Sequence, residues 1–138
     1  MKKILLILTL ASLGFSSKAQ NEEHDKIRDK MTEFIQKRLD LTRNEAERFT
    51  PVFIRYFREW KQTLQETRGD ILIRQQKIVD LRIRYRTEFR EIVGEKRSND
   101  VYKQQDIFIR EIKEMREEQE IYTQALSLFH SFFLSVSL

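Results

Sequence analysis

Apolar side chains recur three or four residues apart along most of this chain, the spacing that places them on one face of an α-helix. Polar runs interrupt the pattern at three places. We therefore predict a first helix from about His24 to Leu39, a second beginning at Thr42, a third from about Ile71 to Val93, and a fourth after Asn99. The fold class that follows is all-α: four helices arranged as antiparallel hairpins in one domain.

The second helix has the clearest start signal. Thr42 and Glu45 have the spacing of a capping box, in which each side chain accepts a hydrogen bond from the backbone amide of the other residue. Pro51 lies inside this helix and removes a backbone donor, so we expect a kink there. The helix also carries an aromatic stripe, which we interpret as core in preference to a binding groove. Its members are Phe49, Phe53, Tyr56, Phe57 and Trp60.

Glycines mark two helix ends. We expect Gly69 to end the second helix in the left-handed conformation, with Asp70 as the N-cap of the third helix. Gly94 closes the third helix in the same way.

The fourth helix is predicted to follow a polar loop over residues 95–99 and to be capped by Ser98 or Asp100. Its apolar positions keep a strict four–three rhythm over several heptads, which indicates a long helix packed lengthwise against partners. Gln105 and Gln119 interrupt that seam, so we expect a partner group to meet each of them. The other seam positions are Val101, Phe108, Ile112, Met115, Tyr122, Leu126, Phe129 and Phe133.

The N-terminus has the three parts of a secretory signal. The basic head Met1-Lys2-Lys3 precedes an apolar run from Ile4 to Phe15, and small residues lead to Ala19. We place the cleavage between Ala19 and Gln20 and expect a periplasmic protein. An uncleaved N-terminal anchor is the alternative interpretation.

Cleavage would change the charge balance. The whole chain has 26 basic and 22 acidic side chains, and three of the lysines lie in the signal, so 23 basic side chains remain. A protein so near neutrality lacks the one-signed field that nucleic-acid binding requires, and we expect no nucleic-acid partner. The chain has no cysteine, which excludes disulfides and thiolate metal sites.

The last stretch of the chain is an apolar tail without charged side chains. Apolar residues lie on all sides of its predicted helix, yet it is shorter than the roughly 20 residues of a membrane span. We expect it to continue the last helix and to contact a second copy of the chain or the membrane surface. The predicted division is a signal peptide at 1–19, a helical domain at 20–124 and the tail at 125–138.

A row of arginines on the third helix is the candidate binding surface. Arg82, Arg86 and Arg90 stand four residues apart, with no acid three or four residues away, beside Val79 and Ile83. One interpretation is a mixed arginine and apolar surface that meets unfolded chains. The other is ion pairing with the acid-rich fourth helix. The acids considered there are Glu111, Glu114, Glu117, Glu118 and Glu120.

Nothing in the sequence indicates an enzyme. It has no serine, histidine and acid constellation, no glycine-rich phosphate loop and no metal-hydrolase motif, so we expect neither catalysis nor a cofactor. The stretch around His24, with Glu22, Glu23 and Asp25, has weak metal-ligand character. We interpret it as a solvated N-terminus and assign no metal site.

The start of the second helix carries a family resemblance. Leu39 to Glu47, with the aromatic stretch from Phe49 through Pro51 to Tyr56, resembles the Spy/CpxP-like periplasmic proteins. That family shares an LTxxQ motif at a helix start, a signal peptide and four helices without disulfides. Here the motif reads Leu41-Thr42-Arg43-Asn44-Glu45, with glutamate in place of the usual glutamine. A second motif, expected before the last helix, is replaced by Glu95-Lys96-Arg97-Ser98-Asn99.

The resemblance implies an ATP-independent chaperone or a stress-sensing accessory protein, formed as a homodimer whose antiparallel hairpins make a curved, basic cradle. We therefore expect a protein of the envelope stress response that binds unfolded polypeptides. The alternative is a sensor or regulatory accessory that binds one envelope-signalling partner and responds to metal.

Export is directly testable. We expect the chain expressed in a Gram-negative host to accumulate in the periplasm with Gln20 as its first residue, as read by N-terminal sequencing or intact mass. Ala19→Arg should block cleavage, because the signal peptidase requires a small residue there. A mature protein that still begins at Met1 would contradict the signal assignment.

Overall fold

The computed structural model describes the backbone of residues 2–136 and the side chains of residues 18–128. It has four helices: α1 (Lys2–Arg38), α2 (Arg43–Glu66), α3 (Ile71–Val93) and α4 (Glu95–Val136). The all-α class and the four helices are confirmed. The predicted signal segment lies mostly outside the described side chains, and so does the end of the apolar tail. Within the described residues, no helix is long and apolar enough to cross a membrane.

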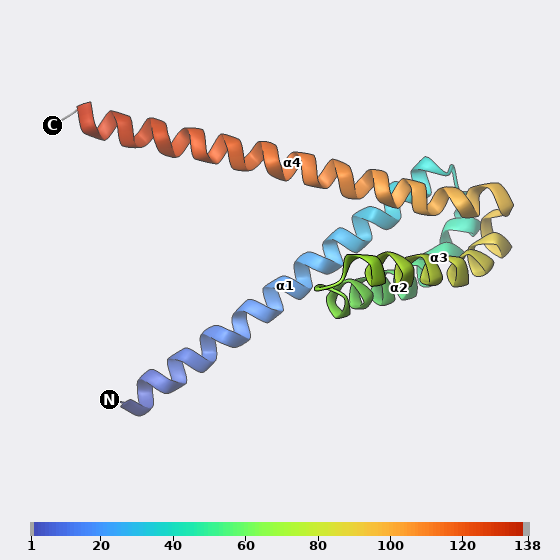
Figure 1. The fold of residues 1–138 in the computed structure, drawn as a ribbon, viewed down its shortest axis with the longest axis horizontal. Helices are drawn as coiled ribbons and strands as arrows, with labels where there is room; N and C mark the ends of the chain where they lie inside the picture. The colour runs from blue at the N-terminus through green and yellow to red at the C-terminus, as the bar shows by residue number, and fades with distance from the viewer. Residues whose placement is uncertain (1, 137–138) are drawn as a thin grey trace.

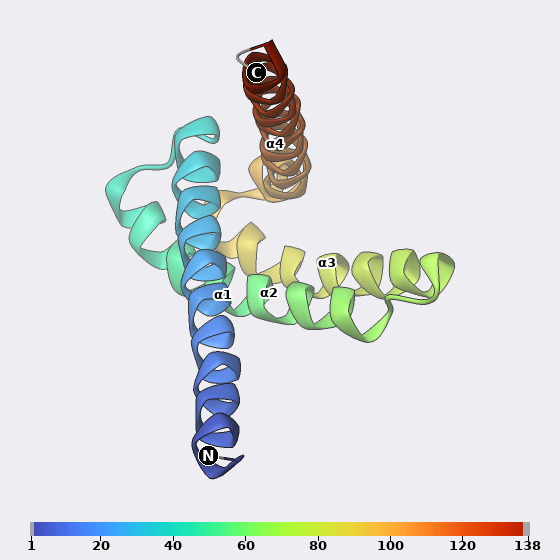
Figure 2. The same cartoon turned by 90° about the vertical axis from the view of Figure 1, so that its left-hand side faces the viewer.

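Consecutive helices pack antiparallel, and α1 also packs on α4. The two long helices α1 and α4 lie together near the end of α1 and the start of α4, and they diverge toward the chain termini (Figure 1). The shorter hairpin of α2 and α3 extends sideways from this pair, with its turn at the far end (Figure 2). The molecule therefore has three projecting ends around one junction.

An aromatic cluster fills the junction. Tyr56 has no exposed surface, and its ring lies 5.5 Å from the rings of both Tyr85 and Tyr102, measured between centroids. The Tyr56 hydroxyl donates a 2.6 Å hydrogen bond to the side-chain carbonyl of Gln105. The aromatic stripe of α2 is thus core, as predicted, with Trp60 at its partly buried edge. The predicted partner for Gln105 is also confirmed.

The break between α1 and α2 follows the predicted position. Asp40 adopts a positive φ of 50°, and the amide of Leu41 donates to the carbonyl of Gln36, five residues earlier, as in a Schellman motif. The capping box then starts α2: the amide of Glu45 donates to the Thr42 hydroxyl, and the amide of Thr42 donates to the Glu45 carboxylate. α2 continues through Pro51 without ending.

The Glu45 carboxylate also connects α2 to α4. Arg97 donates to its two oxygens at 2.5 and 3.0 Å, and the Arg97 Nε donates to the carbonyl of Val93. The hydrogen bond from Arg97, followed by the one from the Thr42 amide, lowers the pKa of Glu45 below its ordinary value of 4.5. The Glu45 side chain therefore caps α2 and also holds the start of α4 against it.

The prediction for Gly69 is wrong, because only Gly94 among the described glycines has a positive φ. α2 ends at Glu66 with Thr67 as its C-cap: the amide and hydroxyl of Thr67 donate to the carbonyl of Thr63, and Arg74 donates to the carbonyls of Thr67 and Arg68 just past the helix. No left-handed residue is then required. Asp70 caps α3 as predicted.

The loop predicted at residues 95–99 is also wrong. Gly94, with φ 84°, closes α3 as expected, and it reverses the chain alone, so that α4 begins at Glu95. The amide of Ser98 donates to the carbonyl of Gly94, which places the helix start before both predicted caps. Ser98 is fully buried in the first turn and donates to the carbonyl of Glu95. The polar composition of residues 95–99 suggested a loop, but these residues form the first turn of α4, which packs against the core through Ser98.

The bounds and packing of the two long helices differ from the expectation. α1 starts at Lys2, well before His24, and ends one residue earlier than predicted. On α4 the seam is buried at Val101, Gln105 and Phe108, and Ile112 is partly buried. From Met115 to Leu128 every α4 residue is exposed, so Gln119 has no partner in another described helix.

The Glu45 contacts predict a pH dependence of stability. Because the folded-state pKa is depressed, the stabilisation is present above the unfolded value of 4.5 and is lost as the pH falls through the folded value. Glu45→Gln keeps the capping geometry but loses the charge pair with Arg97, so its stability should fall less steeply below pH 4.5. Urea unfolding at a series of pH values measures this. If the free energy of unfolding fell equally steeply below pH 4.5 for the wild type and Glu45→Gln, the role given to the Glu45 carboxylate would be contradicted.

Candidate functional site

Two of the three arginines in the predicted binding row are held by α4. Arg82 donates to the Asp106 carboxylate at 2.5 and 3.2 Å and to Gln105 at 3.3 Å, and its guanidinium lies 5.3 Å from the Tyr102 ring centroid. Only 24% of its side chain is exposed. Arg90 pairs with Glu95 at 2.5 Å. These contacts match the ion-pairing interpretation, although none of the five α4 glutamates considered there is the partner.

The rest of the predicted surface is accessible. Arg86 is partly buried and makes no ion pair with any described residue. Val79 and Ile83 are each 52% exposed. The structure therefore leaves one arginine and two aliphatic side chains of the predicted row available to a partner.

Ion pairs between α2 and α3 hold the two helices of the hairpin together. Arg84 donates to Glu59 of α2 at 2.8 Å, and the Tyr85 hydroxyl donates to the same carboxylate at 2.5 Å. The hydrogen bond from Tyr85 is the main cause of a lowered pKa at Glu59. Arg55 of α2 pairs with Glu88 of α3. The arginines and carboxylates of α3 thus position the α2–α3 hairpin.

An apolar groove lies where α1, α2 and α4 separate. Its volume is about 240 Å³, and it opens on one side of the junction. Each of the three helices contributes apolar side chains to its walls, while the charged or polar groups are confined to His24, Lys61 and Arg116. The apolar walls are formed by Ile27 and Met31 of α1, Phe57, Trp60 and Leu64 of α2, and Phe108, Ile109 and Ile112 of α4.

Beyond the groove, α4 has an exposed face with further apolar residues. Beyond Ile112 the seam residues Met115, Tyr122 and Leu126 have more than half of their surface exposed, and Ile121 and Leu128 are exposed beside them. α1 and α4 diverge over this stretch, so neither helix covers the other (Figure 1). Met115 therefore extends the apolar surface just past the groove, and a polar stretch at residues 116–120 separates it from the exposed apolar residues nearer the C-terminus.

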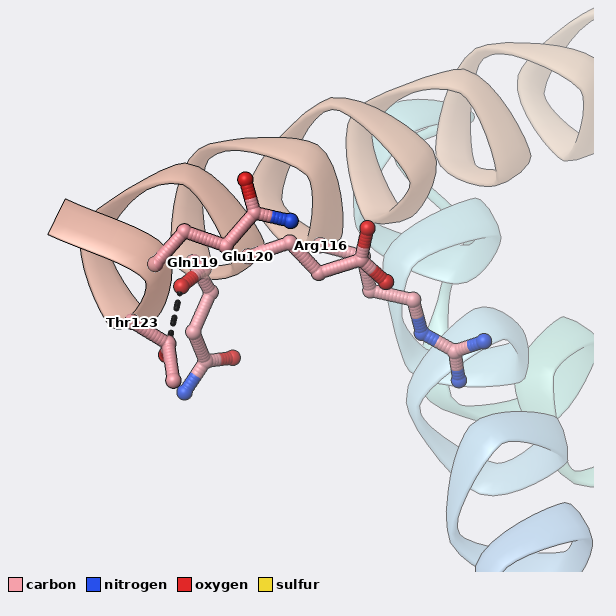
Figure 3. Close-up of a pocket in the computed structure, with 5 residues that line it drawn as sticks. Arg116, Gln119, Glu120 and Thr123 are labelled. Atoms are coloured by element: carbon pink, nitrogen blue, oxygen red, sulfur yellow. Dashed lines mark hydrogen bonds between the residues drawn. The ribbon is translucent and has the colours of Figure 1, made fainter. Parts of the chain in front are cut away.

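A polar contact spans the opening of the groove. Arg116 of α4 donates to Glu23 of α1 at 3.2 Å, across the gap between the two helices. Figure 3 shows the Arg116 side chain directed toward α1, while Gln119, Glu120 and Thr123 lie along the outer part of α4. Both members of this ion pair are exposed, so the pair contributes little to stability and can open.

The sequence indicated an apolar side on each helix that lines this groove, but it did not predict the groove or the contribution of Ile109. Ile27 and Met31 belong to the apolar stripe of the first helix, and Phe108 and Ile112 to the seam of the fourth. Periodicity shows which side of each helix is apolar. Periodicity does not show where two helices diverge. The regular apolar spacing of the fourth helix therefore predicted a seam packed along its whole length, whereas α4 is packed only as far as about Ile112.

The structure offers no new support for a metal centre. His24 lies on the groove wall beside apolar side chains, and Glu23 and Asp25 pair with arginines. Among the described residues, no group of three or more histidine, cysteine, aspartate or glutamate side chains could hold a metal ion.

No protein-family model, curated protein or solved structure matches this chain. The groove, the α4 face and the α3 surface are therefore the features of this protein that bear on its function.

The unequal roles of the arginines are testable. Arg82→Ala should lower the free energy of unfolding by about 1–2 kcal/mol, because it removes charged hydrogen bonds to Asp106 and leaves Gln105 short of a partner. Arg86→Ala should change it by less than about 0.5 kcal/mol. Urea denaturation measures both. Equal losses of unfolding free energy in the two variants would show that Arg82 and Arg86 contribute equally to stability, against this expectation.

Proposed function

We propose that this protein is a periplasmic, ATP-independent holding chaperone of the Spy/CpxP type that binds exposed apolar segments of unfolded polypeptides. The observation that carries the proposal is the apolar groove between α1, α2 and α4, together with the exposed apolar residues on the uncovered face of α4. Apolar side chains gathered at one accessible groove, with further exposed apolar residues on the same helix, are a mark of an interaction site.

The dimensions of the groove favour side chains of a polypeptide over a small ligand. Its volume of about 240 Å³ is below the roughly 300–1,000 Å³ of typical small-molecule pockets. It is open at one side, and few polar groups are available to orient a specific ligand. A few apolar side chains of an extended or helical segment fit such a site, with the rest of the segment lying along α4.

The composition of the surface favours binding of many sequences. Met115, just past the groove on α4, is 55% exposed, and methionine adapts its shape to different partners. The surface has mixed charges at its edge, with Lys61 and Arg116 on one part and the α4 glutamates on another. A site without a dominant charge accepts varied segments.

The α3 surface adds a second contact region. Arg86 supplies a positive charge, and Val79 and Ile83 supply apolar area. Arg82 and Arg90 position α3 against α4 in this proposal, and they contact a client less than the sequence suggested.

The single tryptophan makes groove binding measurable. Trp60 lines the groove, so titration with unfolded client or apolar peptide should change its emission. Purified protein should also slow aggregation of a denatured client at equimolar ratio without ATP. Leu64→Gln/Ile112→Gln should weaken client binding about tenfold, because two apolar contacts are lost.

A matched pair of variants separates binding from folding. Ile71→Gln/Leu72→Gln changes two exposed apolar residues that do not line the groove and should bind clients like the wild type. Thermal melts show whether each variant is folded. Wild-type protein that neither slows aggregation nor shifts its Trp60 emission would overturn the proposal. Saturable binding of one folded protein, without effect on denatured clients, would instead select the regulatory accessory role.

A further inference from the structure

The turn of the α2–α3 hairpin carries three consecutive apolar residues that no described element covers. Ile71, Leu72 and Ile73 are 64%, 73% and 43% exposed. They form the first turn of α3, at the end of the hairpin that projects away from α1 and α4 (Figure 2). They do not belong to the groove or to the predicted arginine surface.

The arrangement of these side chains is convex. Consecutive residues of an α-helix point about 100° apart, so three of them cover most of the circumference of the first turn. A flat or grooved protein partner buries one face of a helix and would leave at least one of the three in water. A medium that surrounds the tip buries all three, and the apolar region of a lipid bilayer is such a medium.

The backbone of the tip is prepared for a water-poor environment. The Asp70 carboxylate accepts hydrogen bonds from the amides of Leu72 and Ile73, at 3.1 and 3.0 Å. Arg74 donates to the carbonyls of Thr67 and Arg68, at 2.9 Å each. Unsatisfied amides and carbonyls are the main obstacle to placing backbone near lipid, and these four hydrogen bonds satisfy two amides and two carbonyls of the turn, which favours a shallow position.

The charges beside the tip favour an anionic surface. Arg68 and Lys77 lie on either side of the apolar residues in the sequence and are exposed, whereas the Arg74 guanidinium is bound to the backbone of the turn. The nearby carboxylates are Glu66 and Asp70, and Asp70 is engaged as the N-cap of α3. Basic residues near an anionic membrane surface add to attraction, each by a modest amount.

We propose that the α2–α3 turn is a membrane-docking tip that inserts Ile71, Leu72 and Ile73 shallowly into an anionic lipid surface, with Arg68 and Lys77 on the headgroups. This site is separate from the groove and does not depend on client binding. It attaches the hairpin by its end and leaves the groove at the junction open to a polypeptide.

Vesicle binding tests the docking tip. The purified protein should co-sediment with vesicles of phosphatidylglycerol and phosphatidylcholine, and less with phosphatidylcholine alone. Ile71→Gln/Leu72→Gln should reduce the partition coefficient about tenfold, and Arg68→Gln/Lys77→Gln should reduce it on the anionic vesicles only. Leu64→Gln/Ile112→Gln, in the groove, and Val79→Gln/Ile83→Gln, farther along α3, should bind vesicles like the wild type.

A fluorescent probe locates the inserted residue. In a Trp60→Phe/Leu72→Trp variant, brominated lipids should quench emission, whereas Trp60 in the wild type should be unaffected. Several outcomes would overturn the proposal. The first is that the wild-type protein does not co-sediment with vesicles. The second is that Ile71→Gln/Leu72→Gln binds vesicles as well as the wild type, which would assign binding to the apolar tail or the N-terminal segment. The third is that this variant loses a protein partner while its vesicle binding is unchanged.

Discussion

Burial of Tyr56 is the constraint on which the rest of this structure depends. Its ring is enclosed by aromatic side chains of α2, α3 and α4, and its hydroxyl donates to Gln105, the one fully buried amide of the described core. A buried hydroxyl without a partner would cost free energy, so Tyr56 and Gln105 must face one another. Burial raises the pKa of Tyr56, which keeps the hydroxyl protonated as a donor. This single contact sets the register of α4 on α2.

The groove is a consequence of that register. Once Gln105 is placed beside Tyr56, the buried part of α4 ends near Ile112, and the remaining seam residues extend past the end of the core. α1 and α4 diverge at the same level, since the α2–α3 hairpin fills the junction between them and not the space beyond it. Apolar side chains of three helices are then exposed together where packing stops. Stability and binding surface arise from the same apolar stripes, used along different parts of their length.

The charged residues act mainly between helices. The Arg84–Glu59, Arg55–Glu88, Arg82–Asp106 and Arg97–Glu45 pairs each join two different helices. Arginine suits this role because its planar, forked donors bind one carboxylate while its stem lies on apolar neighbours. The arginine row on α3 is therefore divided: Arg82 and Arg90 hold α4, and Arg86 stays available. Because Val79 and Ile83 beside Arg86 are also exposed, this part of α3 can still contact a client in the proposed function.

Local signals in the sequence determined the helices. The Thr42–Glu45 box, the Asp70 cap, the Gly94 stop and the aromatic stripe of α2 were predicted correctly because each depends on hydrogen bonds or periodicity within a few residues. The predictions for Gly69 and residues 95–99 failed because Arg74 satisfies the end of α2 and Gly94 alone makes the next turn. Only the tertiary structure decided where α4 leaves the core, which arginines are paired, and that a groove lies between α1, α2 and α4. Those outcomes depend on the distances and angles between helices, and the apolar pattern of each single helix is the same whether its neighbour lies alongside or diverges.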